Sequence, residues 1–145
     1  MSNYGPYESV LTENAWHDGP CAGIGHIGGV PHRFKAIFDE QADEYTAAFH
    51  VWPVAADELA LEIEQWRLFV EWNTRYEAGL ADTTTHPGQG SVNRRWDEIA
   101  ACLDAARSQV PGHAQPAAMR LQRIERALRY DAGGPDYLIS WQLLP

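Results

Sequence analysis

Residues 21–54 read CAGIGHIGGVPHRFKAIFDEQADEYTAAFHVWPV, and this stretch decides the fold that the sequence predicts. Gly28-Gly29 has the composition of a two-residue hairpin turn, in which both central residues need positive φ. The polar segment 39–44 indicates a second turn, and Pro53 ends the last apolar segment because proline cannot donate to a sheet. The stretch therefore predicts three antiparallel strands in a meander, 22–27, 30–38 and 45–52.

The phase of these strands separates an apolar face from a basic one, because side chains alternate between the two faces of a strand. If Phe38 pairs with Tyr45, one face carries the core residues His32, Phe34, Ala36, Phe38, Tyr45, Ala47, Phe49 and Val51. The opposite face then collects basic and aromatic side chains, namely His26, Arg33, Lys35, His50 and Trp52. These five residues are the candidate ligand-binding site, since such a face can hold a carboxylate or phosphate through charge-assisted hydrogen bonds. The alternative is an ordinary solvent-facing side of a sheet.

Residues 55–79 follow the meander and predict one long helix. Asp57 and Glu58 fall in its first turn, where carboxylates suit the helix dipole. Gly79 is a C-terminal stop. Apolar residues cover more than half of the circumference, which predicts that the helix packs against two neighbours.

Glu62 lies among apolar residues of this helix, between Leu59 and Trp66. A carboxylate in an apolar pocket has a raised pKa and can serve as a general acid or base. Glu62 is therefore a weak catalytic candidate. The alternative is that it pairs with an arginine such as Arg33 or Arg123.

Thr83-Thr84-Thr85-His86-Pro87 forms a loop after the helix and contains the second weak catalytic candidate, His86. Hydroxyl groups beside a histidine suggest a nucleophile and its base, but such groups are recognised by their geometry and no elbow motif supports the pair. The alternative is a turn held by local hydrogen bonds from the threonine hydroxyls to the backbone.

The rest of the chain completes a predicted α+β domain that spans residues 1–145. A second helix follows the N-cap candidate Ser91 and ends at Pro111-Gly112, and a third opens at Pro116. Residues 137–144 alternate as a last strand, and residues 1–20 are a partly irregular arm with one short strand near residues 9–12. The expected architecture is a small antiparallel β-meander sheet with a long helix packed on one face and two shorter helices. Its expected core anchors are Trp66, Trp72, Trp96 and Trp141.

Metal and nucleic-acid sites are weakly supported. Four residues that could bind zinc lie within 16 positions, but their spacing matches no zinc-finger pattern: His17, Cys21, His26 and His32. No metal site and no cofactor is predicted. The formal net charge of −9 argues against binding to phosphate backbones. Arginines at a step of three, in positions 120, 123, 126 and 129, would spiral around a helix rather than form a stripe.

The composition predicts a cytoplasmic protein that does not enter a membrane. The chain has 145 residues, of which 45% are hydrophobic, and no apolar run is as long as a membrane span. The first residues do not have the pattern of a secretory signal. Cys21 and Cys102 lie outside any C-x-x-C pair, which favours two free thiols in a reducing compartment.

Part of the chain resembles small bacterial proteins of unknown function. The resemblance spans about residues 16–90 and is carried by five segments: Asp18-Gly19-Pro20, residues 29–34 (GVPHRF), Phe38-Asp39-Glu40, Asp43-Glu44-Tyr45 and Trp52-Pro53-Val54. It implies no activity, but it directs attention to His32, Phe34, Asp39 and His86.

Two functions follow from these observations. The first is a non-enzymatic bacterial accessory protein, immunity-like or regulatory, that engages a protein partner through an acidic surface. The second is a protein that binds a small anionic ligand, or a small enzyme, using the basic sheet face or a pocket around Glu62. Whether the chain is an enzyme, and its oligomeric state, stay open at this point.

Overall fold

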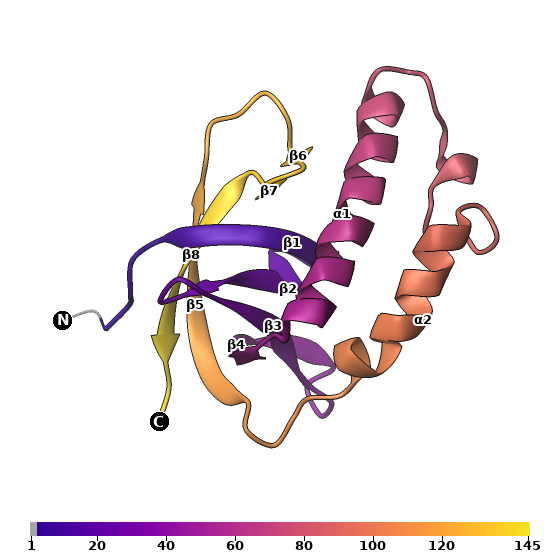
Figure 1. Cartoon of the computed structure of the whole chain (residues 1–145). Helices are drawn as coiled ribbons and strands as arrows, with labels where there is room; N and C mark the ends of the chain where they lie inside the picture. The colour runs from indigo at the N-terminus through magenta and orange to yellow at the C-terminus, as the bar shows by residue number, and fades with distance from the viewer. Residues whose placement is uncertain (1–2) are drawn as a thin grey trace.

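The computed structural model describes residues 3–145 and has an α+β fold, in which a closed antiparallel barrel is covered on one side by two helices (Figure 1). The barrel strands, in their order around the barrel, are β1 (Glu8–Trp16), β2 (Pro20–Ile27), β3 (Val30–Asp39), β4 (Glu44–Pro53), β5 (Gln115–Arg123) and β8 (Tyr137–Leu143). The remaining elements are α1 (Ala56–Glu77), η1 (Thr83–Thr85), α2 (Arg94–Ser108) and the small ribbon of β6 (Tyr130–Asp131) with β7 (Gly134–Pro135).

The predicted register of the first hairpin is confirmed, and that of the second is confirmed at its turn. Ile27 pairs with Val30 across the glycine turn, and Gly28 and Gly29 have φ values of 60° and 77°. Phe38 pairs with Tyr45, as the phase argument required, although an irregularity separates this pair from the rest of the β3–β4 ladder. Beyond the irregularity the ladder is shifted by two residues, so Phe34 pairs with Val51 and the alternation of faces is kept. The predicted core face is buried away from the turn, at Phe34, Ala36, Phe49 and Val51. Near the turn Phe38, Tyr45 and Ala47 are exposed, and the rings of Phe38 and Tyr45 contact each other.

The predicted architecture of an open meander sheet with three helices is wrong. Residues 115–123 form strand β5 instead of the third helix, and β5 joins β4 to β8. Ala117 is fully buried and the alternate residue Met119 packs against the same core, so the segment follows a period of two. Burial between two strands outweighs the helix propensity of its Ala, Met, Leu, Gln and Arg residues.

The N-terminal segment is also more regular than expected. Residues 8–16 form β1, which pairs with β2 and β8 and so closes the barrel. Thr12 is fully buried, and its Oγ1 accepts a hydrogen bond from the backbone N–H of Ile24 at 3.1 Å. The sequence of residues 1–20 does not resemble a strand because few of its side chains are buried. In β1 these are the alternate residues Val10 and Thr12, and most of the others are polar.

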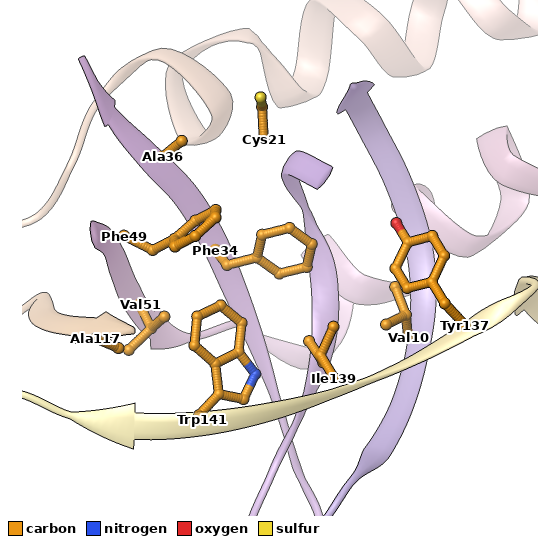
Figure 2. Close-up of a cluster of buried hydrophobic side chains, with 10 residues drawn as sticks. All are labelled: Val10, Cys21, Phe34, Ala36, Phe49, Val51, Ala117, Tyr137, Ile139 and Trp141. Atoms are coloured by element: carbon orange, nitrogen blue, oxygen red, sulfur yellow. The ribbon is translucent and has the colours of Figure 1, made fainter. Parts of the chain in front are cut away.

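The barrel interior holds the main hydrophobic core (Figure 2). The rings of Phe34, Phe49 and Trp141 contact one another with centroid distances of 5.5–6.1 Å. Tyr137 and Ile139 of β8 point into the same space, as the predicted alternation of the last strand required. Trp66 and Trp141 are buried as expected, whereas Trp72 and Trp96 are only partly buried and lie outside the barrel.

Helix α1 lies across the outside of the barrel, and α2 runs beside it on the far side from β1 (Figure 1). Ile24 and Arg33 lie on the outer face of their strands and are buried beneath the helical layer. None of the helices formed by residues 3–145 is both long enough and apolar enough to cross a membrane. Buried charged and polar side chains, among them Arg33, Glu62 and Gln65, lie at the boundary between the barrel and the two helices.

The arginines at positions 120, 123, 126 and 129 lie on β5 and in the following segment, not on a helix. Arg129 forms an ion pair with Glu13 at 2.8 Å, and Arg123 pairs with Asp136 at 2.9 Å. Arg126 bonds to Asp131, and the guanidinium of Arg120 lies over the ring of Tyr4. All four have structural partners within the chain.

Candidate functional site

A cavity of about 410 Å³ lies between the outer face of β1–β3 and the two helices, and we call it the helix–barrel cavity. Its volume is within the range of small-molecule sites in proteins. The barrel, the helices and the loop before α2 all contribute side chains: Glu13, Asn14, Ala22, Gly23, Arg33, Phe34, Lys35, Gln65, Trp66, Phe69, His86, Trp96 and Arg107. These elements come from distant parts of the sequence, so the cavity exists only in the folded chain.

A buried ion network lies behind one side of the cavity. Arg33 donates to Glu62 at 2.6 Å and to Glu58 at 2.9 Å. Arg107 of α2 reaches the same Glu62 carboxylate with two of its nitrogens and also bonds to Gln65. Glu62 is 1% exposed and Arg33 is 3% exposed. Glu62 therefore joins the barrel wall to both helices.

The charge state of Glu62 follows from these partners. Burial alone raises the pKa of a carboxyl group, but the hydrogen bonds and positive charges of Arg107 and Arg33 more than offset it and lower the pKa of Glu62. The expectation of a raised pKa is therefore wrong, and the alternative pairing with Arg33 is what the structure shows. Glu62 is a permanent carboxylate at neutral pH and holds arginines in place.

This lowered pKa predicts a specific acid sensitivity. A carboxyl whose pKa is lower in the folded state stabilises the fold above its unfolded value, about 4.3, and this contribution is lost as the pH falls through the folded value. We expect the stability of the wild type to fall more steeply below about pH 4.3 than that of Glu62→Gln. Urea unfolding at a series of pH values measures both slopes, and equal slopes would contradict the assignment.

Lys35 supplies a positive charge that no carboxylate neutralises among residues 3–145. Its ammonium lines the cavity and donates one hydrogen bond, at 3.1 Å, to the backbone carbonyl of Arg107. An ammonium has three N–H donors, so two stay available. Arg33 also keeps a buried Nε without a hydrogen-bond partner. The cationic side of the cavity therefore has donors that the chain itself does not use.

Aromatic side chains form the other side of the cavity. Trp66 and Phe69 of α1 contact each other at 5.4 Å between ring centroids. Across from them lie Trp96 of α2 and His86, whose rings are 6.1 Å apart. Phe69 also contacts the His86 ring, which closes this part of the wall. Such a surface favours a flat or apolar molecular body.

One nitrogen of the His86 ring is occupied by a hydrogen bond, and burial favours the neutral form of the ring. Its Nδ1 accepts a hydrogen bond of 2.8 Å from the backbone N–H of Gly88, and burial lowers the pKa of the imidazole. A neutral ring whose Nδ1 is an acceptor carries its proton on Nε2. The described residues provide no acceptor for that Nε2–H.

The threonines beside His86 do not form a nucleophile–base pair with it. The Thr84 and Thr85 hydroxyls donate to the side chain and backbone of Asp82, and Thr85 Oγ1 also accepts from Trp72 Nε1 at 3.1 Å. The segment is a capped turn, as the alternative interpretation proposed. Its position places His86 against the helix–barrel cavity.

The structure brings together some of the predicted site residues and separates others. Arg33, Lys35 and His86 line the cavity, and Glu62 supports it from behind. The remaining three members of the basic face do not line it. Trp52 is buried opposite Arg33, His50 lies opposite Lys35, and His26 lies opposite Pro31 near the hairpin turn. The two separate sequence hypotheses, a basic face and a Glu62 pocket, thus meet at Arg33 and Lys35, and the other three residues of the face lie elsewhere.

Sequence reasoning missed Arg107, Gln65 and the aromatic wall. Arg107 continues the spacing of the buried residues Ile99 and Leu103 at steps of four, so it occupies the inward stripe of α2. The sequence does contain a signal for Arg107, because a charged residue here continues a stripe of apolar residues on the helix. The role of Gln65, which donates to the Trp96 carbonyl at 3.2 Å, depends on the packing of α2 and has no local signal.

The four histidine and cysteine residues considered as zinc ligands have other surroundings. Cys21 donates to the carbonyls of His17 and Gly19, and burial raises the pKa of its thiol. The His17 ring packs against Tyr45. His26 and His32 occupy opposite faces of the β2–β3 hairpin. Within residues 3–145, no group of three His, Cys, Asp or Glu side chains is arranged to hold a metal ion.

Comparison with known proteins adds no assignment, because no family model, curated protein or solved structure matches this chain.

Proposed function

We propose that the protein binds a small organic anion in the helix–barrel cavity. The observation that carries this proposal is Lys35, which lines the cavity, has no carboxylate partner among residues 3–145 and donates one hydrogen bond to a backbone carbonyl. A ligand carboxylate or phosphate there would gain charge-assisted hydrogen bonds from its free donors.

The local charge supports an anion even though the whole chain is acidic. Three cations, Arg33, Lys35 and Arg107, face two carboxylates, Glu58 and Glu62, so the cluster has an excess of one positive charge. Glu13, the carboxylate that lines the cavity, already accepts from Arg129 and from the Tyr137 hydroxyl. An incoming anion therefore meets a positive end without an opposing free carboxylate.

The aromatic wall supports an organic body rather than a bare inorganic ion. Trp66, Phe69 and Trp96 offer apolar surface that an inorganic ion would leave unused. Burial of a ring or chain against such surface contributes about 25 cal/mol per Å² of apolar area. A small molecule with one anionic group and an apolar body uses both sides of the cavity.

Binding is favoured over catalysis because both candidate catalytic groups have structural tasks. Glu62 is ionised and bonded to two arginines, and the Nδ1 of His86 is bonded to the backbone. Engagement of a protein partner through an acidic surface stays an untested prediction. It would involve the exposed carboxylates of the β3–β4 turn, Asp39, Glu40, Asp43 and Glu44.

Removal of the Lys35 charge should abolish most of the affinity. With biphenyl-4-carboxylate as the probe, we expect Lys35→Met to weaken binding about tenfold or more, because a hydrogen bond to a charged group contributes about 1.5–3 kcal/mol. Isothermal titration calorimetry measures the dissociation constant. Arg67→Met, which removes an exposed cation of α1 outside the cavity, is the matched control and should bind as the wild type does.

A failure to bind this anion and a panel of other aryl and alkyl carboxylates would refute the proposed function. Binding that is unchanged in Lys35→Met, or reduced equally in Arg67→Met, would also refute it, because the cavity would then not be the site. Circular dichroism of both variants verifies that they are folded.

A further inference from the structure

We infer that the ligand is an elongated aromatic carboxylate with a hydrogen-bond acceptor, such as a carbonyl oxygen, at its far end, and that His86 recognises this acceptor. The inference rests on the proposed function and narrows it to a class of molecule. Three features of the helix–barrel cavity carry it: the separation of its two polar ends, the donor of His86, and the rings between them.

The two polar ends lie near opposite ends of α2. The Lys35 ammonium bonds to the carbonyl of Arg107 in the last turn of α2, whereas the His86 ring contacts Trp96 in its first turn. Eleven residues separate these two positions, which corresponds to about 16 Å along a helix axis at 1.5 Å per residue. Side chains reach inward from both ends, so the free length is shorter than this, and a ligand that contacts both Lys35 and His86 has to extend along α2.

His86 presents a donor and not an acceptor at its end. The Gly88 N–H occupies Nδ1, which places the ring proton on Nε2, and Nε2 has no acceptor among the described residues. A donor that lines a cavity and lacks a partner gains a hydrogen bond from a ligand acceptor. A ligand that ends in a second donor, such as an ammonium, would leave this N–H unpaired.

The middle of the cavity requires a flat, unsaturated body. Phe69 of α1 contacts His86, Trp66 follows it one turn closer to the start of the helix, and Phe34 lines the cavity from the barrel. Aromatic rings prefer offset-stacked or edge-to-face contacts with other rings, which adds specificity beyond the area buried. The arrangement therefore selects an aryl body with an anion at one end and an acceptor at the other.

The experiment compares two anions that differ only at the far end, biphenyl-4-carboxylate and 4′-acetylbiphenyl-4-carboxylate. We expect the wild type to bind the acetyl compound about five- to tenfold more tightly, which is the value of one additional hydrogen bond in a buried site. His86→Phe should bind both compounds equally. His86→Gln should restore the preference, because its amide N–H₂ lies close to the position of Nε2.

Both histidine variants lose the hydrogen bond from Gly88 to the side chain of residue 86. A difference in ligand preference between the two variants therefore reports the side-chain donor and not a change in the loop. A preference for the acetyl compound that persists in His86→Phe, or that is absent from the wild type, would overturn the inference. In that case Lys35-dependent binding of both anions would leave the proposed function intact. If neither anion binds in a Lys35-dependent way, both the inference and the proposed function fail.

Discussion

Glu62→Ala is expected to lower the free energy of unfolding by about 3–5 kcal/mol. The substitution leaves Arg33, which is 3% exposed, with the partly exposed Glu58 as its one remaining carboxylate among the described residues, and it removes the link to Arg107. Removal of one partner from a buried ion pair has this magnitude because a charge that is less well compensated stays in the interior. Urea unfolding followed by tryptophan fluorescence measures the change.

Two further variants distinguish the buried charge from a general loss of helix contacts. Glu64→Ala removes an ion pair with Arg95 that is about half exposed, and it should cost less than about 1 kcal/mol. The double variant Arg33→Met/Glu62→Leu should be more stable than Glu62→Ala, because it removes the stranded cation and refills the space with apolar atoms. A loss for Glu62→Ala no larger than that for Glu64→Ala would contradict the role of the network.

Gly134→Ala is expected to cost about 3 kcal/mol or more, or to prevent folding. Gly134 has a φ of 130°, and a Cβ at this position would lie 2.0 Å from the backbone carbonyl oxygen of Val10. Strained backbone and overpacking each cost about 1–3 kcal/mol, and neither the strand β1 nor its carbonyl can move without disturbing the barrel. Thermal unfolding followed by circular dichroism measures the loss.

Gly90→Ala is the matched control for this substitution. Gly90 lies in a loop, its φ is not positive, and no atom lies within 4 Å of a Cβ built there. We expect a change within about 0.5 kcal/mol of the wild type. If Gly134→Ala were as stable as Gly90→Ala, the close contact between the β6–β7 ribbon and β1 would be wrong.

The register of the first hairpin and the long helix could be predicted from the sequence because their signals are local, whereas the shift of two residues within the second hairpin has no such signal. Gly28-Gly29 fixes one turn, and the alternation of residues 30–38 fixes which side chains face the core. The closure of the barrel could not be predicted in this way. Residues 115–123 consist mainly of helix-forming amino acids, and their conformation depends on pairing with β8 and with β4, which lies far away in the sequence.

The candidate site was accessible from the sequence only in part. Arg33 and Lys35 share a face by simple alternation, and Glu62 stands out as a charge within an apolar stripe. Their union with Arg107 and His86 requires the antiparallel packing of α2 against α1, which no short motif encodes. The same packing reverses the expected pKa shift of Glu62, because the sign depends on which cations surround the buried carboxylate.

The barrel is completed by a seam between its first and last strands, where Glu8 lies opposite Ile139 and Ser9 opposite Leu138. A chain that emerges from the ribosome with its N-terminus first can form the β2–β4 meander early, but β1 has no second neighbour until β8 is made. Tyr137 and Trp141 of β8 complete the interior at that same moment. Before then, the apolar side chains of β1–β4 are uncovered on one side, so the synthesis of β8 converts an exposed half-barrel into a closed one.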